Sequence, residues 1–272
     1  MSYFKLSYRR WLAWLALAIL FAVACWFLSQ WQFARRAQVV AAIEQLDANY
    51  GMPPIDLPTA QAGKPDSLKW RPVKVSGIYL LNELLLVRNR PSNGNPGFEQ
   101  LIPLKTADGT VVFVNRGWLP TGNQQDKPDV NPLPVSSQVT IVGNLMPSEP
   151  LTQRGAPSGQ LPVANGYLAA RQLGFPVRST VRSFYLRLIS ETPAAEKSPK
   201  AFSKPQITEG NHLSYALQWL IFGLLAFTAL GLAIRKEAME YRAVHDPTYS
   251  PKPKRVTQAK RDEEAEDAAN AN

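Results

Sequence analysis

Cysteine and histidine are almost absent from this chain. Its 272 residues include a single cysteine, Cys25, and two histidines, His212 and His245. One cysteine cannot form an intrachain disulfide. Residues 32–210 contain neither residue type. That stretch therefore cannot supply the usual Ser-His-Asp or Cys-His nucleophile systems, an ordinary zinc site or a paired-cysteine copper site.

The sequence also lacks any recognisable nucleic-acid-binding motif. The net charge is +9, but the basic residues form no single stripe. The positive excess therefore indicates control of membrane topology and contacts with anionic lipid headgroups or acidic proteins, not nucleic acid. A Ser-Lys hydrolase stays open because Ser67 and Lys69 are available, although no motif supports it.

Two long runs contain no charged side chain. The first begins at Trp11 and meets no charge before Arg35, and the second covers residues 213–234. Each is long enough to cross a hydrocarbon core of about 30 Å as a helix. The first run could also be a cleavable signal peptide, since AVAC at residues 22–25 imitates a lipoprotein cleavage site. Cleavable apolar regions are usually only about 7–15 residues long, so we expect a retained anchor.

Basic residues near the two runs predict the orientation of the chain. Six basic residues lie between a run and the nearer chain terminus: Lys5, Arg9, Arg10, Arg235, Lys236 and Arg242. Four lie between the two runs: Arg35, Arg36, Lys200 and Lys204. Basic flanks favour the cytoplasm. We predict cytoplasmic segments at 1–10 and 235–272, spans at 11–31 and 211–234, and a domain at 32–210 in the periplasm or its organellar equivalent. The last segment is rich in Pro, Lys and Glu and is expected to be a disordered tail.

The segment between the spans is predicted to be a β domain with helical borders. Residues 32–48 continue the first span as a helix, and residues 167–173 form a short helix ended by Gly174. Asp108 and Gly109 supply the positive φ angles of a tight hairpin turn. Six segments are predicted strands: 71–79, 83–90, 99–105, 110–116, 138–145 and 181–189. Short strands with local connections favour a mainly antiparallel, barrel-like sheet, so the predicted class is an α+β membrane protein.

His212 stands one residue outside the second uncharged run. At helical spacing it shares a face with Tyr215, Ala216 and Trp219, at i+3, i+4 and i+7. Such a face could hold a flat aromatic ligand or another helix. The alternative is that His212 begins an interfacial helix, while the two aromatic residues belong to the belt that anchors spans at the membrane surface.

Two polar clusters in the central domain are further candidates for binding a partner or for a structural role. They comprise Arg88, Arg90, Asn115, Arg116, Gly117 and Trp118. The planar arginine fork suits carboxylates, so a haem propionate or an acidic patch on a partner could be the counterpart. The alternative is that these arginines pair with acids of the same domain and that Trp118 is a core residue.

Short motifs follow one another in a specific order between the two spans. The strongest is VNRGWLP at residues 114–120. The others are Trp31-Gln32 with Arg35, Gly77 with Tyr79, Arg88-Asn89-Arg90 with Gly94 and Gly97, and His212-Leu213 with Tyr215 and Trp219. In this order they resemble the Surfeit-locus/Shy-type cytochrome c oxidase assembly proteins, and the resemblance leaves out both tails.

The resemblance implies an assembly factor for a haem-copper terminal oxidase, not an enzyme. Bacterial members resemble transient binders of haem a, with an axial histidine that corresponds to His212 and lies beside Tyr215 and Trp219. The implied partners are the catalytic subunit of the oxidase, the haem-synthesis or assembly machinery, and membrane lipid. The implied location is the bacterial inner membrane.

Two alternatives to haem binding remain open. One is a membrane scaffold that stabilises an oxidase assembly intermediate without touching haem. The other is an enzyme, and the lack of histidine and cysteine in the central domain counts against it.

Overall fold

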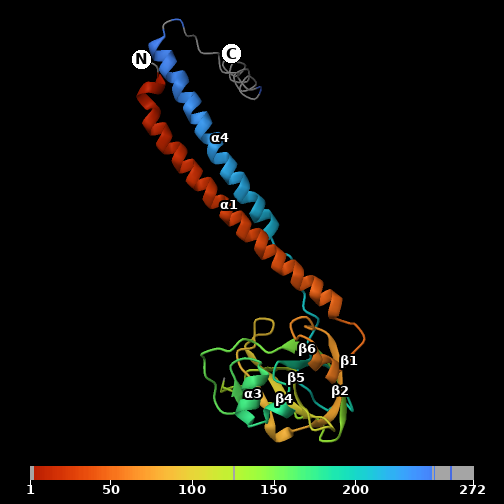
Figure 1. Cartoon of the computed structure of the whole chain (residues 1–272). Coiled ribbons are helices and arrows are strands. Elements are labelled where there is room, and N and C mark those ends of the chain that lie inside the picture. The colour runs from red at the N-terminus through yellow and green to blue at the C-terminus, as the bar shows by residue number, and fades with distance from the viewer. Residues whose placement is uncertain (1–2, 125, 247, 249–257, 259–272) are drawn as a thin grey trace, which may run out of the picture. The chain divides into compact units, whose positions relative to one another are not determined.

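The computed structural model describes residues 3–124, 126–246, 248 and 258 (Figure 1). The chain divides into two compact units. One comprises Met1–Ala37 with Glu209–Asn272 and is helical, and the other comprises Gln38–Thr208 and contains the β-sheet. This order confirms the prediction of a sheet domain between two terminal helices.

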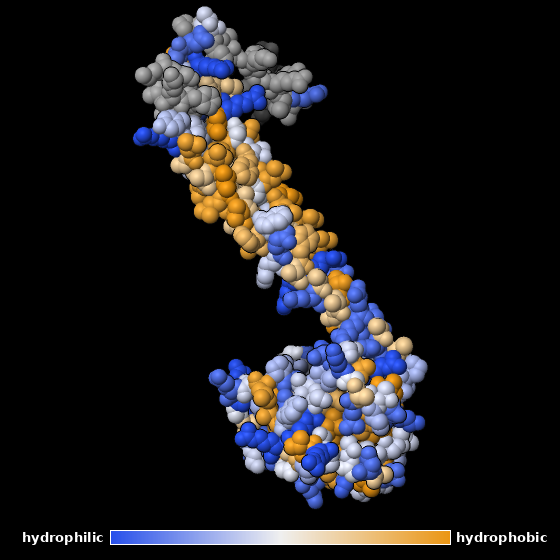
Figure 2. Space-filling model, in the orientation of Figure 1, coloured by the Kyte–Doolittle hydropathy of each residue, from blue (hydrophilic) through white to orange (hydrophobic). Residues whose placement is uncertain are grey.

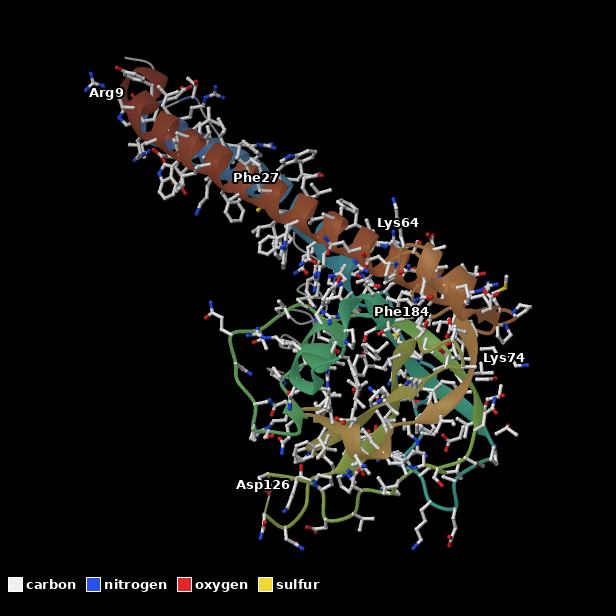
Figure 3. All side chains as sticks on the ribbon, turned by 60° about the horizontal axis from the view of Figure 1, so that its bottom comes forward. Arg9, Phe27, Lys64, Lys74, Asp126 and Phe184 are labelled. Carbon is white, nitrogen blue, oxygen red and sulfur yellow. The ribbon has the colours of Figure 1, made fainter. Side chains whose placement is uncertain are left out.

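The two uncharged runs lie in helices α1 (Tyr3–Asn49) and α4 (His212–His245). Within the described residues, these two helices are long and apolar enough to cross a membrane. Figure 2 shows the apolar exterior of this unit, and Phe27 of α1 is 66% exposed (Figure 3). Exposed apolar surface on this scale supports insertion in a membrane. The predicted helix at 32–48 is confirmed as the continuation of α1.

α4 is longer than predicted. It runs to His245, so the prediction of a disordered tail is wrong for residues 235–245. Lys236 and Glu240 stand at i, i+4 with 3.8 Å between charged atoms, which supports a helix. Arg242 lies in the last turn, where a cation complements the helix dipole. The remainder of the predicted tail, apart from residues 246, 248 and 258, lies outside the described residues.

α1 and α4 run antiparallel to each other. Near one end of the pair Arg10 of α1 is paired with Glu237 of α4, and near the other end Gln32 of α1 contacts His212 of α4. The contacts join residues far apart in sequence, so they fix the register of the two helices.

Small side chains fill the contact between the two helices. Cys25 and Ser29 of α1 are buried, as is Ala216 of α4. A Cβ added to Gly223 of α4 would lie 3.6 Å from that of Cys25. Such residues let two helix backbones approach closely, which is a common mode of packing between membrane helices.

Over the described residues, the strands of the second unit form one eight-stranded sheet in the order β1-β2-β6-β8-β5-β4-β3-β7. The strands are β1 Ile55–Asp56, β2 Pro72–Tyr79, β3 Leu85–Val87, β4 Gly97–Lys105, β5 Val111–Pro120, β6 Val139–Pro147, β7 Gln160–Leu161 and β8 Phe184–Thr192. The helices are α2 Leu57–Ala62, α3 Gly166–Leu173 and two 3-10 turns, Leu81–Glu83 and Val177–Ser179. All six predicted strands are present, whereas β1, β7 and α2 lie outside the prediction.

The sheet is mixed, which corrects the prediction in part. Antiparallel pairings predominate, but β1 with β2, β3 with β7 and β5 with β8 are parallel. The last arises because β8 inserts between β5 and β6, which run in opposite directions, so it can be antiparallel only to one of them. β2 also pairs over two residues with β4, the kind of contact that a barrel requires. The barrel-like shape itself stays a prediction.

Apolar clusters cover both faces of the central strands. Val112 and Val114 of β5 belong to one cluster, together with the buried Phe184 (Figure 3). Phe113, between them, belongs to a second cluster that includes residues of α3. Alternation along a strand explains this division. As predicted, α3 ends at Gly174, which adopts the left-handed conformation with φ +70°.

The predicted hairpin turn joins β4 to β5, with one difference. Gly109 has a φ of +84°, but Asp108 does not adopt a positive φ. The Asp108 carboxylate instead accepts hydrogen bonds from Thr106 and Thr110. These bonds hold the pKa of that carboxyl below its usual range.

Candidate functional site

His212 is the first residue of α4 and lies against α1. Its Nδ1 is 2.9 Å from Oε1 of Gln32. An amide oxygen only accepts hydrogen bonds, so in the neutral imidazole this contact favours the tautomer with the proton on Nδ1 and the lone pair on Nε2. Histidines that ligate metals commonly donate one ring N–H to such an acceptor and bind the metal with the other nitrogen. Asn211 makes no side-chain cap, so the histidine is not part of a capping motif.

The other three residues of the predicted face differ in their surroundings. Ala216 is fully buried, while Tyr215 is 51% exposed. Trp219 is half-buried, with its ring at 85° to that of Phe222 and 5.8 Å between the centroids. The line of α4 that faces α1 therefore runs through His212 and Ala216, and Tyr215 lies to its side.

Removing the Gln32 contact tests whether it sets the tautomer of His212. Gln32→Leu is expected to change the ratio of the two neutral tautomers about fivefold, because one hydrogen bond is worth about 1 kcal/mol. Nitrogen-15 NMR of histidine-labelled full-length protein measures this ratio. His245→Ala supplies the assignment, since it leaves His212 as the only histidine. An unchanged ratio in the Gln32 variant would mean that the contact does not set the tautomer.

The start of α4 also carries an ion pair. Arg36 Nη2 lies 2.7 Å from Glu209 Oε2, and both side chains are substantially exposed. Arg36 follows Gln32 by four positions, and His212 follows Glu209 by three. The ion pair thus lies close in sequence to the Gln32–His212 contact, with Arg36 on α1 and Glu209 just before α4, and it marks the polar edge of the apolar helix pair.

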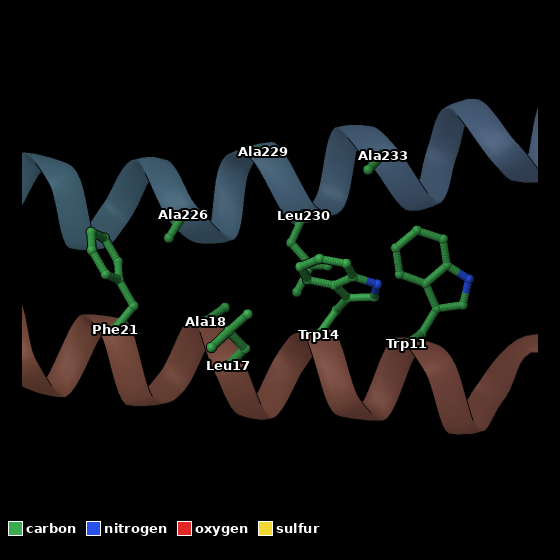
Figure 4. A pocket seen from close by; sticks show the side chains of 9 residues that line it. All are labelled: Trp11, Trp14, Leu17, Ala18, Phe21, Ala226, Ala229, Leu230 and Ala233. Carbon is green, nitrogen blue, oxygen red and sulfur yellow. The ribbon is translucent and has the colours of Figure 1, made fainter.

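A groove of about 640 Å³ lies between the two helices in a different region (Figure 4). Its lining residues are all apolar: Trp11, Trp14, Leu17, Ala18, Phe21, Ala226, Ala229, Leu230 and Ala233. Ala226 follows His212 by 14 residues, which is about 21 Å along a helix. The groove and the histidine are therefore separate features.

Arg116 is buried in the sheet domain, with a side chain that is 0% exposed. Its Nη2 lies 2.7 Å from Oε1 of Glu191, and its Nη1 donates to Gln100 Oε1 at 2.7 Å and to the Pro132 carbonyl at 3.2 Å. The Tyr79 hydroxyl donates to the same carboxylate at 3.1 Å. Burial, aided by the Glu191 charge, raises the pKa of Tyr79. These contacts agree with the structural alternative for Arg116.

Arg90, Asn115 and Trp118 form a second, more open cluster. Arg90 Nη2 lies 2.6 Å from Glu149 Oε2, and its Nε lies 3.5 Å from Glu99 Oε2. Asn115 donates to the Glu99 carboxylate at 2.7 Å. Trp118 is half-buried, so it is not a core residue, and its Nε1 donates to the Arg90 carbonyl at 2.6 Å.

Arg88 is separated from these clusters. It lines a pocket of about 370 Å³ with Asn89, Phe98 and Thr121. The predicted candidates in the sheet domain thus fall into three places: Arg116 inside, the half-buried Arg90 and Trp118 with the buried Asn115, and Arg88 in its own pocket.

Comparisons with known proteins identify relatives along most of the chain. A family model described as the SURF1 family matches residues 19–224. An uncharacterized SURF1-like protein of Mycobacterium tuberculosis is 30% identical over 231 residues, which cover 80% of this chain and 82% of the relative. A SURF1-like protein of Rickettsia felis is 28% identical over 71% of this chain and 84% of its own length. The Surfeit locus protein 1 of Xenopus tropicalis is 32% identical over 48% of this chain and 47% of its own length.

Proposed function

Since this chain belongs to the SURF1 family, we propose that it is an assembly factor for a haem-copper oxidase that holds haem a through His212 or aids its insertion into the catalytic subunit. The family is associated with oxidase assembly, and its members are assembly factors, not known enzymes. The proposal includes the bacterial inner membrane as the location, with the sheet domain in the periplasm and both termini in the cytoplasm. The observation that carries it is the Gln32 contact, which leaves His212 Nε2 free.

The donor set at the start of α4 fits a haem iron better than a bare metal ion. In the part of the chain that the structure describes, no group of three or more His, Cys, Asp and Glu could hold a metal ion. A haem iron takes only one or two axial ligands from the protein, because the macrocycle supplies the others. His212 Nε2 would be one axial ligand, and the exposed Tyr215 with the half-buried Trp219 offers aromatic surface beside it.

The visible spectrum of the purified protein tests this proposal. Full-length protein is co-expressed with a haem a synthesis pathway, and haem a per polypeptide is measured for the wild type, His212→Ala and His245→Ala. We expect the haem a content per polypeptide of His212→Ala to be lower than that of the wild type by a factor of at least about ten, because the iron–imidazole bond is lost. The matched control, His245→Ala, should retain as much as the wild type.

Two outcomes would contradict haem binding. The wild type could carry no haem a, or His212→Ala could carry as much as the wild type. The scaffold alternative would then stand, in which the helices and the sheet domain stabilise an assembly intermediate. The internal pairing of Arg90 and Arg116 is compatible with that alternative, since it removes two candidate contacts to haem propionates.

A further inference from the structure

Arg187 is a half-buried arginine of the sheet domain, and its guanidinium is stacked on aromatic rings. It lies in β8, between β5 and β6. Arg90 and Arg116 are each paired with carboxylates. Within the described residues, Arg187 makes no ion pair and no side-chain hydrogen bond. Burial lowers the pKa of its guanidinium, against the opposing effect of the Glu99 charge, and such burial is costly unless a ligand compensates for it.

Aromatic rings hold the Arg187 guanidinium in place. Its Cζ lies 3.8 Å from the centre of the Phe202 ring and 5.8 Å from that of Trp70. Asn115 and Asn144 are its partners in the register of the neighbouring strands. Both have buried Oδ1 atoms without a hydrogen-bond partner, yet Arg187 does not donate to either. The guanidinium is therefore held by stacking on aromatic rings, and its N–H groups remain able to donate hydrogen bonds to a ligand.

The guanidinium lines a pocket of about 210 Å³. Lys200 and Trp118 line the same pocket, with the Lys200 ammonium 5.8 Å from the centre of the Trp118 ring. Glu99 also lines it, but its carboxylate already accepts from Asn115 at 2.7 Å and lies 3.5 Å from Arg90 Nε. Arg187 and Lys200 are thus two cations in this pocket that make no ion pair, as far as the described residues extend.

We propose that Arg187 and Lys200 form a binding site for an organic carboxylate, which is either an acidic side chain of a partner protein or a small free acid. The guanidinium fork matches a carboxylate with two parallel hydrogen bonds, and Lys200 adds a second positive charge. Trp118 and Phe202 would cover the methylene groups that carry the carboxylate. The volume of the pocket equals that of about seven water molecules, which suits a carboxylate with its methylene groups and is too small for a haem macrocycle. The site is independent of haem binding at His212.

Ligand NMR on haem-free, full-length protein in detergent tests the site. Glutarate is the probe, and saturation transfer from aromatic protons reports its binding. We expect saturable transfer to glutarate and none to glutaramide, which lacks the charge. Arg187→Gln is expected to weaken binding at least about tenfold, and Arg187→Lys to weaken it less, since it keeps the charge without the fork. Arg178→Gln is the matched control, because Arg178 is exposed and lies outside the pocket.

Two further measurements separate this role from a purely structural one. The melting temperature of Arg187→Gln should equal or exceed that of the wild type, because an unpaired half-buried charge is removed. A peptide with one Glu, acetyl-Gly-Glu-Gly-amide, distinguishes the sources: tighter binding than glutarate assigns the site to a partner protein, and equal binding assigns it to a free acid.

Three results would overturn the proposal. They are the absence of carboxylate-dependent transfer in the wild type, equal glutarate binding by Arg187→Gln, and stronger binding of inorganic phosphate than of glutarate. The last would make the pocket a phosphate site instead.

Discussion

Arg116→Ala is expected to lower the free energy of unfolding of the sheet domain by about 3–5 kcal/mol, because removing one partner of a buried ion pair leaves the other charge uncompensated. The Glu191 side chain is only 6% exposed and would keep the Tyr79 hydroxyl as its one remaining donor from this network. Gln100 Oε1 and the Pro132 carbonyl would lose the donor that Arg116 now provides. Denaturant unfolding of the full-length protein, followed by tryptophan fluorescence, measures the change.

Arg88→Ala is the matched control for this substitution. Arg88 is half-buried in a pocket and, among the described residues, makes no ion pair. Its removal should change the free energy of unfolding by no more than about 0.5 kcal/mol. The double substitution Arg116→Met with Glu191→Leu should recover much of the loss, since no buried charge is then left alone. If Arg116→Ala unfolds at the same denaturant concentration as the wild type, this network does not hold the domain together.

The apolar segments of the sequence predicted the strands well because each follows from local side-chain alternation. Their order in the sheet could not be predicted in the same way. β8 inserts between β5 and β6, although it follows both in sequence, and this insertion makes its pairing with β5 parallel. β1 and β7 are two residues long, too short for any period to be visible. The order of strands therefore depends on long-range contacts that no window of sequence contains.

The candidate residues show the same limit. The sequence singled out Arg116 within VNRGWLP, but its partner Glu191 stands 75 residues away. His212 was predicted from its position at the edge of an uncharged run, whereas the side chain that contacts its ring belongs to Gln32, 180 residues away. Arg187 belongs to no motif, and nothing in its neighbourhood in the sequence indicates that it stacks on Trp70 and Phe202.

The backbone around Gly117 explains how VNRGWLP places Arg116 inside the sheet. Gln100 pairs with Gly117, while Leu101 pairs with Asn115, so Arg116 is the extra residue of a β-bulge. Gly117 has a φ of +147°, a backbone conformation that L-residues with a side chain rarely adopt. In this chain the bulge at Arg116 and the backbone of Gly117 thus accompany the burial of the arginine.

Gly117→Ala is therefore expected to lower the free energy of unfolding by about 2–3 kcal/mol, from strain at this φ and from contact with a neighbouring segment. A Cβ at this position would lie 2.5 Å from the Lys200 carbonyl oxygen and 3.0 Å from Pro199 Cβ. Lys200 exchanges two backbone hydrogen bonds of 2.9 Å with Trp118, so the clash would force this pairing apart. Denaturant unfolding of the full-length protein measures the loss.

Gly109→Ala is the control that measures the cost of backbone strain without a contact to Lys200. Gly109 also has a positive φ, of +84°, but a Cβ there would meet nothing within 4 Å. Its substitution should cost about 1 kcal/mol, the usual penalty for a left-handed residue with a side chain. The excess loss in Gly117→Ala then measures the close approach of residues 199–200 to the bulge. Equal losses in the two variants would mean that this segment can move away freely, and that the bulge does not depend on it.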